Sequence, residues 1–433
     1  MKILLGILAL TTLLQGCSGP AGQETADNAI TLPVPKRTPF NKNLDLDAST
    51  YRDKVLGALV GSAIGDAMGA STEMWNRVDI QREYGYITDL TPVNLSRQAE
   101  GPWGNLLDSG ATTDDTRWKY FLGKYFAKHS SNLDVDHFAQ MIVDYYQTEV
   151  RGLADPQLAS SPDLLDNRIQ RIDWMKEWAR VALAYKKGGI EFERAKNRFY
   201  GGEMSCAGML YTPMFGLIAP HADSAYRLGY DHALFDIGYA KDISGMVSAF
   251  THLALQEDSI ALVLQQGMLI DPFDYTDSRL VGRLLQNIVD ESRGIVQEAW
   301  KIPAADTTKV VKLLQGYPGS KYEWLQQDYV YRELTKKQRA IAFHAGEIFQ
   351  ILYTALLFGQ GDFEKTMAFM VNYGRDNDTV AAVAGMILGA QLGFKNLPDT
   401  LKEAVMHTNK EILGIDLETL ANEVVAAADN KQP

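Results

Sequence analysis

Cysteine is scarce in this sequence: only Cys17 and Cys206 occur among 433 residues. At most one disulfide is possible, so stability must come from the hydrophobic core rather than from a disulfide framework. The 46% of hydrophobic residues supply ample apolar material for such a core. No His or Asn pattern surrounds Cys206, which favours a small buried hydrophobe over a catalytic nucleophile.

A surplus of positive charge is also lacking. The chain carries 42 Lys and Arg against 54 Asp and Glu, a formal net charge of −12, and it has no stripe of basic residues. Binding to a nucleic-acid backbone is therefore disfavoured. A credible succession of alternating strands is missing as well, which argues against a doubly wound α/β sheet.

The N-terminal apolar run, Ile3 to Leu14, lacks the length needed to span a bilayer but is typical of a signal-peptide core. It ends in Leu14-Gln15-Gly16-Cys17, which resembles the bacterial lipoprotein processing box. We therefore predict a signal peptide at residues 1–16 and lipidation of Cys17. The alternative is an ordinary secretory signal followed by an incidental cysteine.

Residues 17–49 are polar and proline-rich and show no sustained period, so we predict a flexible linker between the lipid and the folded domain. Ser18, rather than Asp, follows the cysteine. By analogy with Gram-negative lipoproteins, this indicates a cell-envelope protein anchored in the outer membrane through its lipid alone.

Beyond the linker the hydrophobic pattern is helical. Apolar residues recur at i, i+3 and i+4 from Arg52 almost to the C-terminus, including the stretches 222–256 and 336–358. The predicted fold class is all-α, with one domain at residues 50–428. Residues 266–335 contain two turn-forming stretches and several aromatics, and we interpret them as an elaboration of that domain.

Two acidic stretches carry the chemistry. The first acidic cluster is Thr113-Asp114-Asp115-Thr116, and the second acidic cluster is Asp376-Asn377-Asp378-Thr379. Each precedes a helical pattern, where one capping Asp needs no further explanation. Two carboxylates with threonines at both places exceed what capping requires, because crowded carboxylates repel one another unless a cation neutralises them. Oxygen ligands of this kind suit Mg²⁺ or Mn²⁺.

A third acid, Glu73, follows Gly65-Asp66-Ala67-Met68-Gly69, and on its own it is interpreted as a solvated loop residue. Three motifs follow one another along the chain: this glycine-rich motif with its Glu, then Thr-Asp-Asp-Thr, then Gly-x-Asp-x-Asp-Thr before a small-residue helix. This ordered set resembles the ADP-ribosylglycohydrolase family. His344 to Asp362 is also similar to the helix and turn that precede the family's last cluster. The resemblance covers roughly residues 50 to 410.

The resemblance implies an all-α fold and a binuclear Mg²⁺ or Mn²⁺ site, with Glu73 as a mobile glutamate that guards it. The implied metal ligands are Thr113, Asp114, Asp115, Asp376, Asp378 and Thr379. The family cleaves glycosidic bonds at the anomeric carbon of an ADP-ribose-like ribose. Paired cations and carboxylates suit this reaction, because they hold vicinal hydroxyls, activate water and stabilise oxocarbenium character. Glu73 or a metal-bound carboxylate such as Asp114, Asp115 or Asp378 would handle the protons.

The middle of the chain departs from the family pattern. Many members carry Asn-Gly-x-x-Met-Arg, which touches the diphosphate, whereas the corresponding stretch here begins Tyr200-Gly201-Gly202-Glu203-Met204-Ser205. The Asn and Arg are missing. Gly201, Gly202 and Ser205 are then the candidate substrate-binding residues, and a smaller ribosyl compound becomes an alternative to ADP-ribose.

The sequence therefore predicts a metal-dependent glycosidic hydrolase acting on a small-molecule ribosyl or ADP-ribosyl substrate. A descendant of the family that binds such ligands without cleaving them is the alternative. A solute-binding lipoprotein is a third hypothesis, but it requires two lobes of alternating strands and helices, which this sequence lacks.

Overall fold

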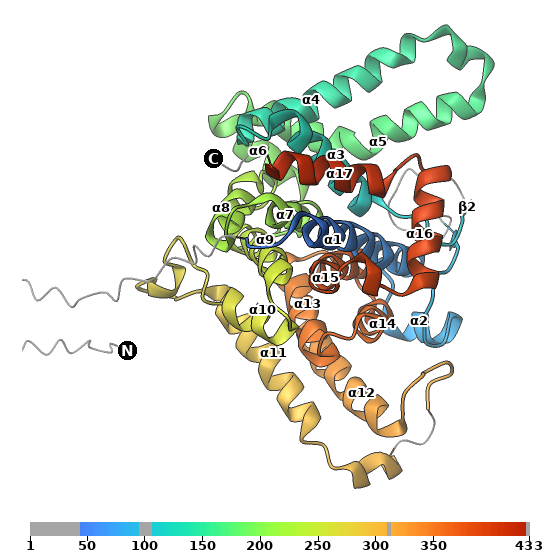
Figure 1. Cartoon of the computed structure of the whole chain (residues 1–433), viewed down its shortest axis with the longest axis vertical. Helices are drawn as coiled ribbons and strands as arrows, with labels where there is room; N and C mark the ends of the chain where they lie inside the picture. Colours follow the sequence, from blue (N-terminus) through green and yellow to red (C-terminus); the bar gives the residue numbers. More distant parts are fainter. Residues whose placement is uncertain (1–43, 95–105, 310–312, 430–433) are drawn as a thin grey trace, which may run out of the picture. The chain divides into compact units, whose positions relative to one another are not determined.

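The computed structural model describes residues 44–94, 106–309 and 313–429, which all belong to one compact unit, Pro39–Pro433 (Figure 1). The predicted signal peptide 1–16, Cys17 and the linker as far as residue 43 lie outside the described residues. The linker's last residues are described: Asp47 caps the first helix by accepting hydrogen bonds from the backbone N–H groups of Ser49 and Thr50. This cap starts the helix at Ala48, ahead of the predicted Arg52.

Helices account for nearly all of the regular structure. A single antiparallel pair of two-residue strands, β1 (Val93–Asn94) and β2 (Leu106–Leu107), is the exception among the described residues. The all-α prediction is therefore confirmed. The α-helices are α1 Ala48–Gly69, α2 Arg77–Glu83, α3 Asp114–His129, α4 Val135–Arg151, α5 Pro162–Tyr185, α6 Gly189–Phe199, α7 Phe215–Ile218, α8 Ala222–His232, α9 Ala240–Gln256, α10 Ile260–Gly267, α11 Leu284–Trp300, α12 Lys321–Thr335, α13 Ala345–Gly359, α14 Phe363–Tyr373, α15 Asn377–Leu392, α16 Asp399–Glu411 and α17 Leu417–Asp429.

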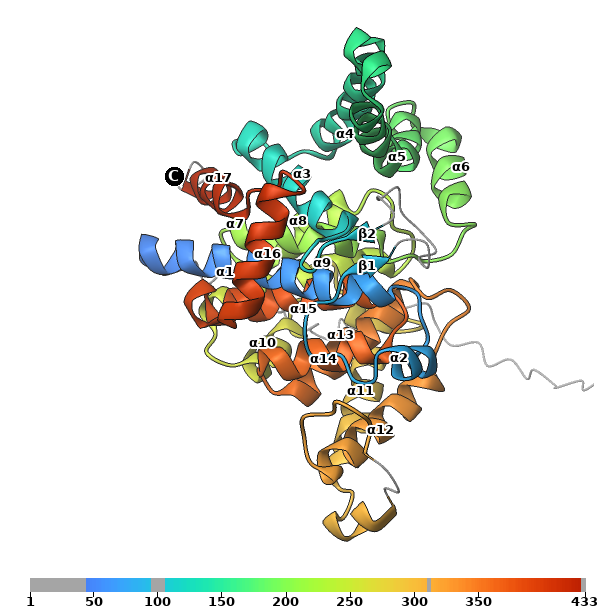
Figure 2. The ribbon, with the colours of Figure 1, turned by 90° about the vertical axis from the view of Figure 1, so that its right-hand side faces the viewer.

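Helices α1 and α15 form the centre and lie side by side in both views (Figures 1 and 2). Helices α3, α16 and α17 pack against α1, while α9, α13 and α14 pack against α15. Helix α1 with the following turn is apolar and long enough to cross a membrane, yet its apolar window is 100% buried within the protein, as in a core helix.

Glycines allow the two central helices to touch through their backbones. A Cβ atom at Gly57, Gly61, Gly65 or Gly69 of α1 would overlap backbone atoms of α15 or of the residues that follow it. The partners run backwards along α15, from Gly389 opposite Gly57 to Asp378 opposite Gly69. The helices are therefore antiparallel, and the end of α1 meets the start of α15.

Two predicted helices are corrected by the structure. The stretch 222–256 is broken into α8 and α9 by residues 233–239, where Gly238 has a φ of 55°. Ala233, Leu234 and Phe235 in this connection are buried, so the apolar pattern continues although the helix does not. The stretch 336–358 becomes helical only at Ala345, because α12 ends at Thr335 and a turn follows.

The predicted elaboration, residues 266–335, contains α11 and α12, and α11 packs on α13. A buried ion pair fastens its first part to α9. The Arg283 guanidinium donates to both carboxylate oxygens of Asp242 at 2.6 and 2.9 Å, and also to the Ile270 carbonyl at 2.8 Å. Tyr226 donates its hydroxyl hydrogen to the same carboxylate at 2.6 Å.

Replacing Arg283 by Met is expected to lower the free energy of unfolding by about 3–5 kcal/mol, because it leaves the buried Asp242 charge uncompensated. Urea denaturation measures this loss. The double variant Arg283→Met with Asp242→Leu removes both charges and is expected to recover most of it. An equal loss in both variants would show that the ion pair itself is not what matters.

Candidate metal centre

The antiparallel packing of α1 and α15 brings together the chain segments that carry the acidic residues. Gly69 lies against the backbone of Asp378, and the 3₁₀ turn Ala70–Thr72 follows it. The first acidic cluster forms the first turn of α3, where the Thr113 hydroxyl accepts a hydrogen bond from the Asp115 N–H at 3.3 Å. The second acidic cluster forms the start of α15. The two clusters are therefore neighbouring helix N-termini.

Two hydrogen bonds cross between the clusters. The Thr113 hydroxyl donates to the Asp378 carboxylate at 3.2 Å, across 265 positions of sequence. The Thr379 hydroxyl donates to the Asp115 carboxylate at 2.8 Å. Each cluster thus supplies a threonine to an aspartate of the other, and the predicted convergence of the two segments is present in the fold.

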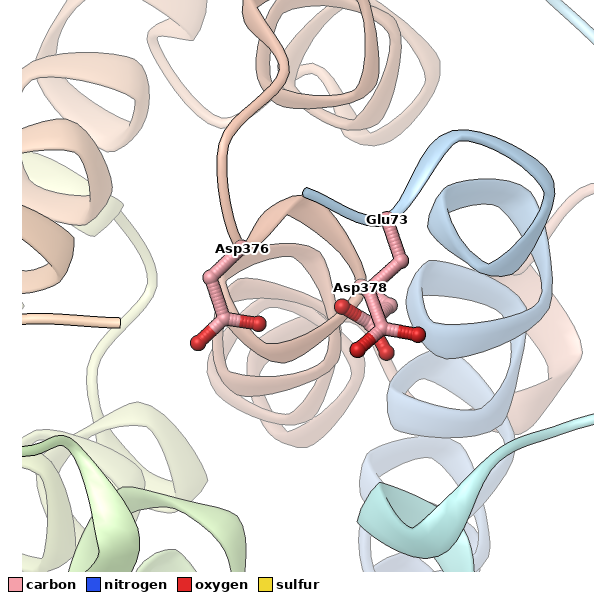
Figure 3. A group of neighbouring side chains, drawn as sticks. All are labelled: Glu73, Asp376 and Asp378. Atoms are coloured by element: carbon pink, nitrogen blue, oxygen red, sulfur yellow. The ribbon is translucent and has the colours of Figure 1, made fainter. Parts of the chain in front are cut away.

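Glu73 completes the group from a third segment. The Met74 N–H donates to the Arg375 carbonyl and the Arg375 N–H donates to the Trp75 carbonyl, both at 2.8 Å. These bonds hold the residue after α1 beside the residues before α15. One oxygen each from Glu73, Asp376 and Asp378 lies within 4.8 Å of the others (Figure 3). We call these three residues the carboxylate triad.

The backbone on both sides of the triad is strained. Met74 and Arg375 adopt left-handed φ values of 62° and 68°, which side chains with a Cβ rarely take. Arg375 is held in place by an ion pair with the buried Glu347 at 2.5 Å and by hydrogen bonds to two carbonyls. Strain that the surroundings maintain in this way fits a pre-organised site.

Burial of the acidic side chains disfavours their charged forms. Burial, together with the nearby Asp115, raises the pKa of Asp376 to about 7. Burial and the charges of Glu73 and Asp376 raise the pKa of Asp378 well above its ordinary value. Without a cation, Asp376 and Asp378 therefore hold on to protons more tightly than ordinary carboxyl groups do.

The donor set fits a hard divalent cation. Asp378 is 2% exposed, and its Oδ1 atom has no hydrogen-bond partner among the described residues. A buried carboxylate oxygen without a partner is costly, and coordination by a cation would satisfy it. The triad carboxylates are oxygen ligands of the kind that Mg²⁺ and Mn²⁺ prefer.

The four remaining predicted ligands lie around the triad and differ in their burial and hydrogen bonding. Asp114 is half-buried and faces the same cavity as the triad. Asp115 is 1% exposed and already bonded on both oxygens, to Lys119 Nζ at 3.1 Å and to Thr379. Thr113 and Thr379 are buried and donate to carboxylates. Coordination by these four residues stays a prediction.

Sequence reasoning overlooked two supporting residues. Asp66, fully buried in α1, accepts hydrogen bonds from the Thr113 N–H at 2.9 Å, the Thr116 N–H at 3.0 Å and the Thr116 hydroxyl at 2.6 Å. It therefore caps α3 and fixes the first acidic cluster. Lys119 lies one turn into α3 and supplies a positive charge to Asp115. Its spacing of four residues from Asp115 is the signal that the sequence offered.

Cys206 also has a role that the sequence did not reveal. It is buried as predicted, but its thiol donates to the Asp376 carboxylate at 3.1 Å, and it lines the cavity beside the triad. Burial and the Asp376 charge raise the pKa of the thiol well above its ordinary value. A thiol that stays protonated is a poor nucleophile, so Cys206 positions Asp376.

A cavity of about 610 Å³ opens from the triad. The lining side chains include six carboxylates and five aromatic rings. None of the described residues between 266 and 335 lines it, so the described part of the elaboration does not contribute to this cavity. The full lining is Glu73, Met74, Asp114, Asp173, Trp174, Lys176, Glu177, Trp178, Phe199, Tyr200, Cys206, Leu210, Phe343, Asp376, Asp378 and Thr379.

The predicted substrate-binding stretch meets this cavity only at its ends. Tyr200 and Cys206 line it, whereas Gly201, Gly202 and Ser205 are not among the lining residues. Gly201 and Gly202 are exposed, with left-handed φ values of 64° and 79°. Ser205 is buried and pairs with His344 in an isolated β-bridge. Contact of these three residues with substrate remains a prediction.

Residues 47–433 match the ADP-ribosylglycohydrolase family. The chain belongs to this family. Members of the ADP-ribosylglycohydrolase family are glycosidic hydrolases, so membership supports a hydrolase activity of this class for the chain.

Individual relatives of this chain are distant. ADP-ribosylhydrolase ARH3 from Bos taurus is 22% identical over 366 residues, which cover 80% of this chain and 87% of that protein. ADP-ribosyl-[dinitrogen reductase] glycohydrolase from Rhodospirillum rubrum is 35% identical over 86 residues, 20% of this chain and 26% of that protein. The uncharacterized protein YegU from Escherichia coli is 30% identical over 97 residues, 22% of this chain and 27% of its own length.

A solved structure described as an ADP-ribosylglycohydrolase-related protein complex shares the fold. It aligns with a TM-score of 0.52 and 16% identity over 88% of this chain and 99% of that one. At this identity the likeness concerns the fold alone.

The raised carboxylate pKa values predict an unusual pH dependence of stability for the metal-free protein. Asp66 and Asp376 have folded-state pKa values of about 6 and about 7, above the ordinary value of 3.8. The folded state then binds protons more tightly than the unfolded state, so protonation of these two carboxyl groups contributes to the free energy of unfolding. This contribution is complete below pH ~4 and is lost as the pH rises through 6 and 7. The loss between pH 5 and 8 is on the order of a few kcal/mol.

Thermal unfolding with a chelator at pH 5, 6, 7 and 8 tests this dependence. The melting temperature is expected to fall relative to an Asp376→Asn/Asp378→Asn variant as the pH rises, and added Mg²⁺ or Mn²⁺ should cancel the fall. A difference between the two proteins that is constant with pH would mean that the triad does not titrate in this range.

Proposed function

We propose that this protein is a metal-dependent hydrolase that cleaves a glycosidic bond at the ribose of an ADP-ribosyl or related ribosyl compound. The observation that carries the proposal is the meeting of Glu73, Asp376 and Asp378 beside a cavity large enough for such a ligand, in a chain of the ADP-ribosylglycohydrolase family. Hydrolysis at an anomeric carbon needs groups that stabilise positive charge there and that take up a proton, and carboxylates do both.

The proposed cofactors are two Mg²⁺ or Mn²⁺ ions, held by the triad together with Thr113, Asp114, Asp115 and Thr379. When bound, such ions bind ribose hydroxyls and lower the pKa of water. We assign proton transfer and the stabilisation of positive charge to the protein's own residues. Glu73, half-buried at the cavity edge, is placed to accept the proton of the attacking water. Asp114, which faces the same space, is placed to stabilise oxocarbenium character.

The surrounding contacts keep these groups in place. Cys206 donates to Asp376 and Thr113 donates to Asp378, so each of these carboxylates retains other lone pairs for a cation. Asp66 fixes the entrance of α3. A site pre-organised in this way orients substrate and water without reorganisation during the reaction.

Lipidation of Cys17 and a place in the bacterial cell envelope belong to the same proposal. The support is the resemblance of Leu14-Gln15-Gly16-Cys17 to the lipoprotein processing box. Radiolabelled palmitate fed to expressing bacteria should be incorporated into the full chain and not into the Cys17→Ala variant. Equal incorporation into both would remove Cys17 as the lipidation site.

A panel of ribosyl compounds, assayed with and without a chelator, tests the enzymatic proposal. We expect release of free ribose or ADP-ribose from at least one compound, its loss on chelation and its recovery with Mg²⁺ or Mn²⁺. Micromolar binding of ribosyl ligands without any turnover would contradict the hydrolase and favour the binding-only descendant. Turnover that is unaffected by chelation would contradict the metal dependence.

A further inference from the structure

The cavity beside the carboxylate triad has an unusual charge for a site expected to hold a diphosphate. Its described lining contains six carboxylates and one ammonium group, that of Lys176. Lys176 is already paired with Asp173 at 2.9 Å. The carboxylates outside the triad are Asp114 of α3 and Asp173 and Glu177 of α5. Even two bound divalent cations leave the lining with more negative than positive charge. A diphosphate would enter against this charge.

The three predicted substrate-binding residues, Gly201, Gly202 and Ser205, are not part of the described cavity lining. Gly201 and Gly202 are exposed and do not line the cavity, and a Cβ at Gly201 would meet no atom within 4 Å. The Ser205 hydroxyl is buried outside the lining. Among the described residues, the cavity thus offers neither a set of unpaired cations nor a glycine turn to a phosphate.

The cavity offers aromatic rings instead. Trp178 contacts Phe199 edge-to-face with ring centroids 5.1 Å apart, Phe199 contacts Tyr200 at 4.4 Å, and Tyr200 contacts Phe343 at 5.5 Å. With Trp174, these rings are the aromatic side chains of the described lining, and we call them the aromatic wall. Phe199, Tyr200 and Phe343 are only half-buried, so part of their surface is available to a ligand. Aromatic walls hold flat bases by stacking and attract cations to their faces.

From this lining we infer that the substrate is an N-riboside without a diphosphate, whose leaving group is a flat cationic base of the pyridinium type. The ribose would lie at the triad and the base along the aromatic wall, near Asp173 and Glu177. This inference rests on the proposed function and names its substrate class.

The chemistry of such a substrate suits the residues present. The oxygen of water forms a bond to C1′, the C1′–N bond breaks, and its electron pair passes to the base nitrogen. One proton of the water goes to a carboxylate, for which Glu73 is placed. A pyridinium leaves as a neutral pyridine and needs no proton, so the site requires a base but no separate acid beside the leaving group.

A matched series of substrates tests the inference on the full chain with Mn²⁺ present. Nicotinamide riboside, nicotinamide mononucleotide and NAD share the same base and the same scissile bond. The first has no phosphate, the second has one phosphate, and the third has a diphosphate that carries an adenosine. Each is assayed as both anomers, beside an ADP-ribosylated peptide. We expect kcat/KM to fall at least about 100-fold from the riboside to the dinucleotide, since like-charge repulsion opposes the negative charge of the diphosphate.

Charge variants on α5 identify the cause of the selectivity. Asp173→Asn with Glu177→Gln should narrow the ratio of kcat/KM between riboside and dinucleotide about tenfold, mainly through KM. The matched control is Asp163→Asn with Asp166→Asn, which makes the same charge change at exposed positions of the same helix outside the cavity lining. This control should leave the ratio unchanged.

Substitutions of Tyr200 separate the effect of the aromatic rings on substrate binding from the effect of the carboxylates. Tyr200→Leu should raise KM for the riboside about tenfold with little change in kcat, and Tyr200→Phe should restore it, because the ring face rather than the hydroxyl makes the contact.

The outcomes distinguish the inference from the proposed function. Efficient metal-dependent cleavage of NAD or of the ADP-ribosylated peptide, with the riboside equal or worse, would overturn the inference and leave the proposed function standing. Turnover of no compound would overturn the proposed function, and the inference with it.

Discussion

Replacing Asp376 and Asp378 together by asparagine is expected to abolish divalent-metal binding and to lower kcat/KM for any ribosyl substrate by about 1,000-fold or more. Asparagine keeps the shape of both side chains and removes two buried charges whose pKa values are raised by burial and by neighbouring carboxylates. The metal-free variant should therefore be more stable than the metal-free parent at pH 8, because the repulsion within the triad is relieved.

The combination of lost metal binding with gained stability is the diagnostic result. Isothermal calorimetry with Mg²⁺ and Mn²⁺ measures the first, and thermal unfolding with a chelator measures the second. The parent should gain about 2.7 kcal/mol of stability at a metal concentration 100 times the dissociation constant, and the variant nothing. The Asp163→Asn/Asp166→Asn protein serves as the charge control. Metal binding by the variant equal to that of the parent would remove both residues from the site.

Gly65→Ala is expected to lower the free energy of unfolding strongly, because the added methyl group has no space between the two central helices. A Cβ at Gly65 would overlap the backbone of Ala381 and Ala382 in α15, and neither helix is free to move because other helices pack on both. We expect a loss of about 3 kcal/mol or more, as in other overpacked cores. Separation of α1 from α15 would also displace Asp378 from Glu73, so metal affinity should fall in the same variant.

Gly294→Ala is the matched control for this change. Gly294 lies inside α11, and a Cβ there would meet no atom within 4 Å. The same methyl group should stabilise the protein by about 0.5–1 kcal/mol, because alanine is the better helix former. Urea denaturation compares the two. A neutral effect of Gly65→Ala would show that the central helices are not packed through their backbones.

The sequence revealed the fold class and the acidic segments because these depend on local patterns. Helical periodicity and small residues predicted α1 and α15, and crowded carboxylates beside Thr113 and Thr379 marked both clusters. The errors in the predicted helices also arose from local patterns. The apolar period continued through the connection between α8 and α9, since Ala233 and Phe235 are buried whether or not their backbone is helical.

The contacts that complete the site depend on tertiary structure and have no local signal. Glu73 alone has the pattern of a solvated loop acid, and it joins the triad only because the backbone of Met74 pairs with that of Arg375. Cys206 reaches Asp376 across 170 positions of sequence. The cavity lining, with its carboxylates on α5 and its rings on α5 and α6, likewise follows from packing that periodicity does not specify.

Anomalous X-ray diffraction from a crystal of this protein grown with Mn²⁺ shows directly whether the triad holds a cation. We expect anomalous density at the meeting point of α1, α3 and α15, within about 2.5 Å of oxygens of Asp376 and Asp378. Density confined to surface sites, with the triad carboxylates bonded only to protein or water, would contradict this expectation.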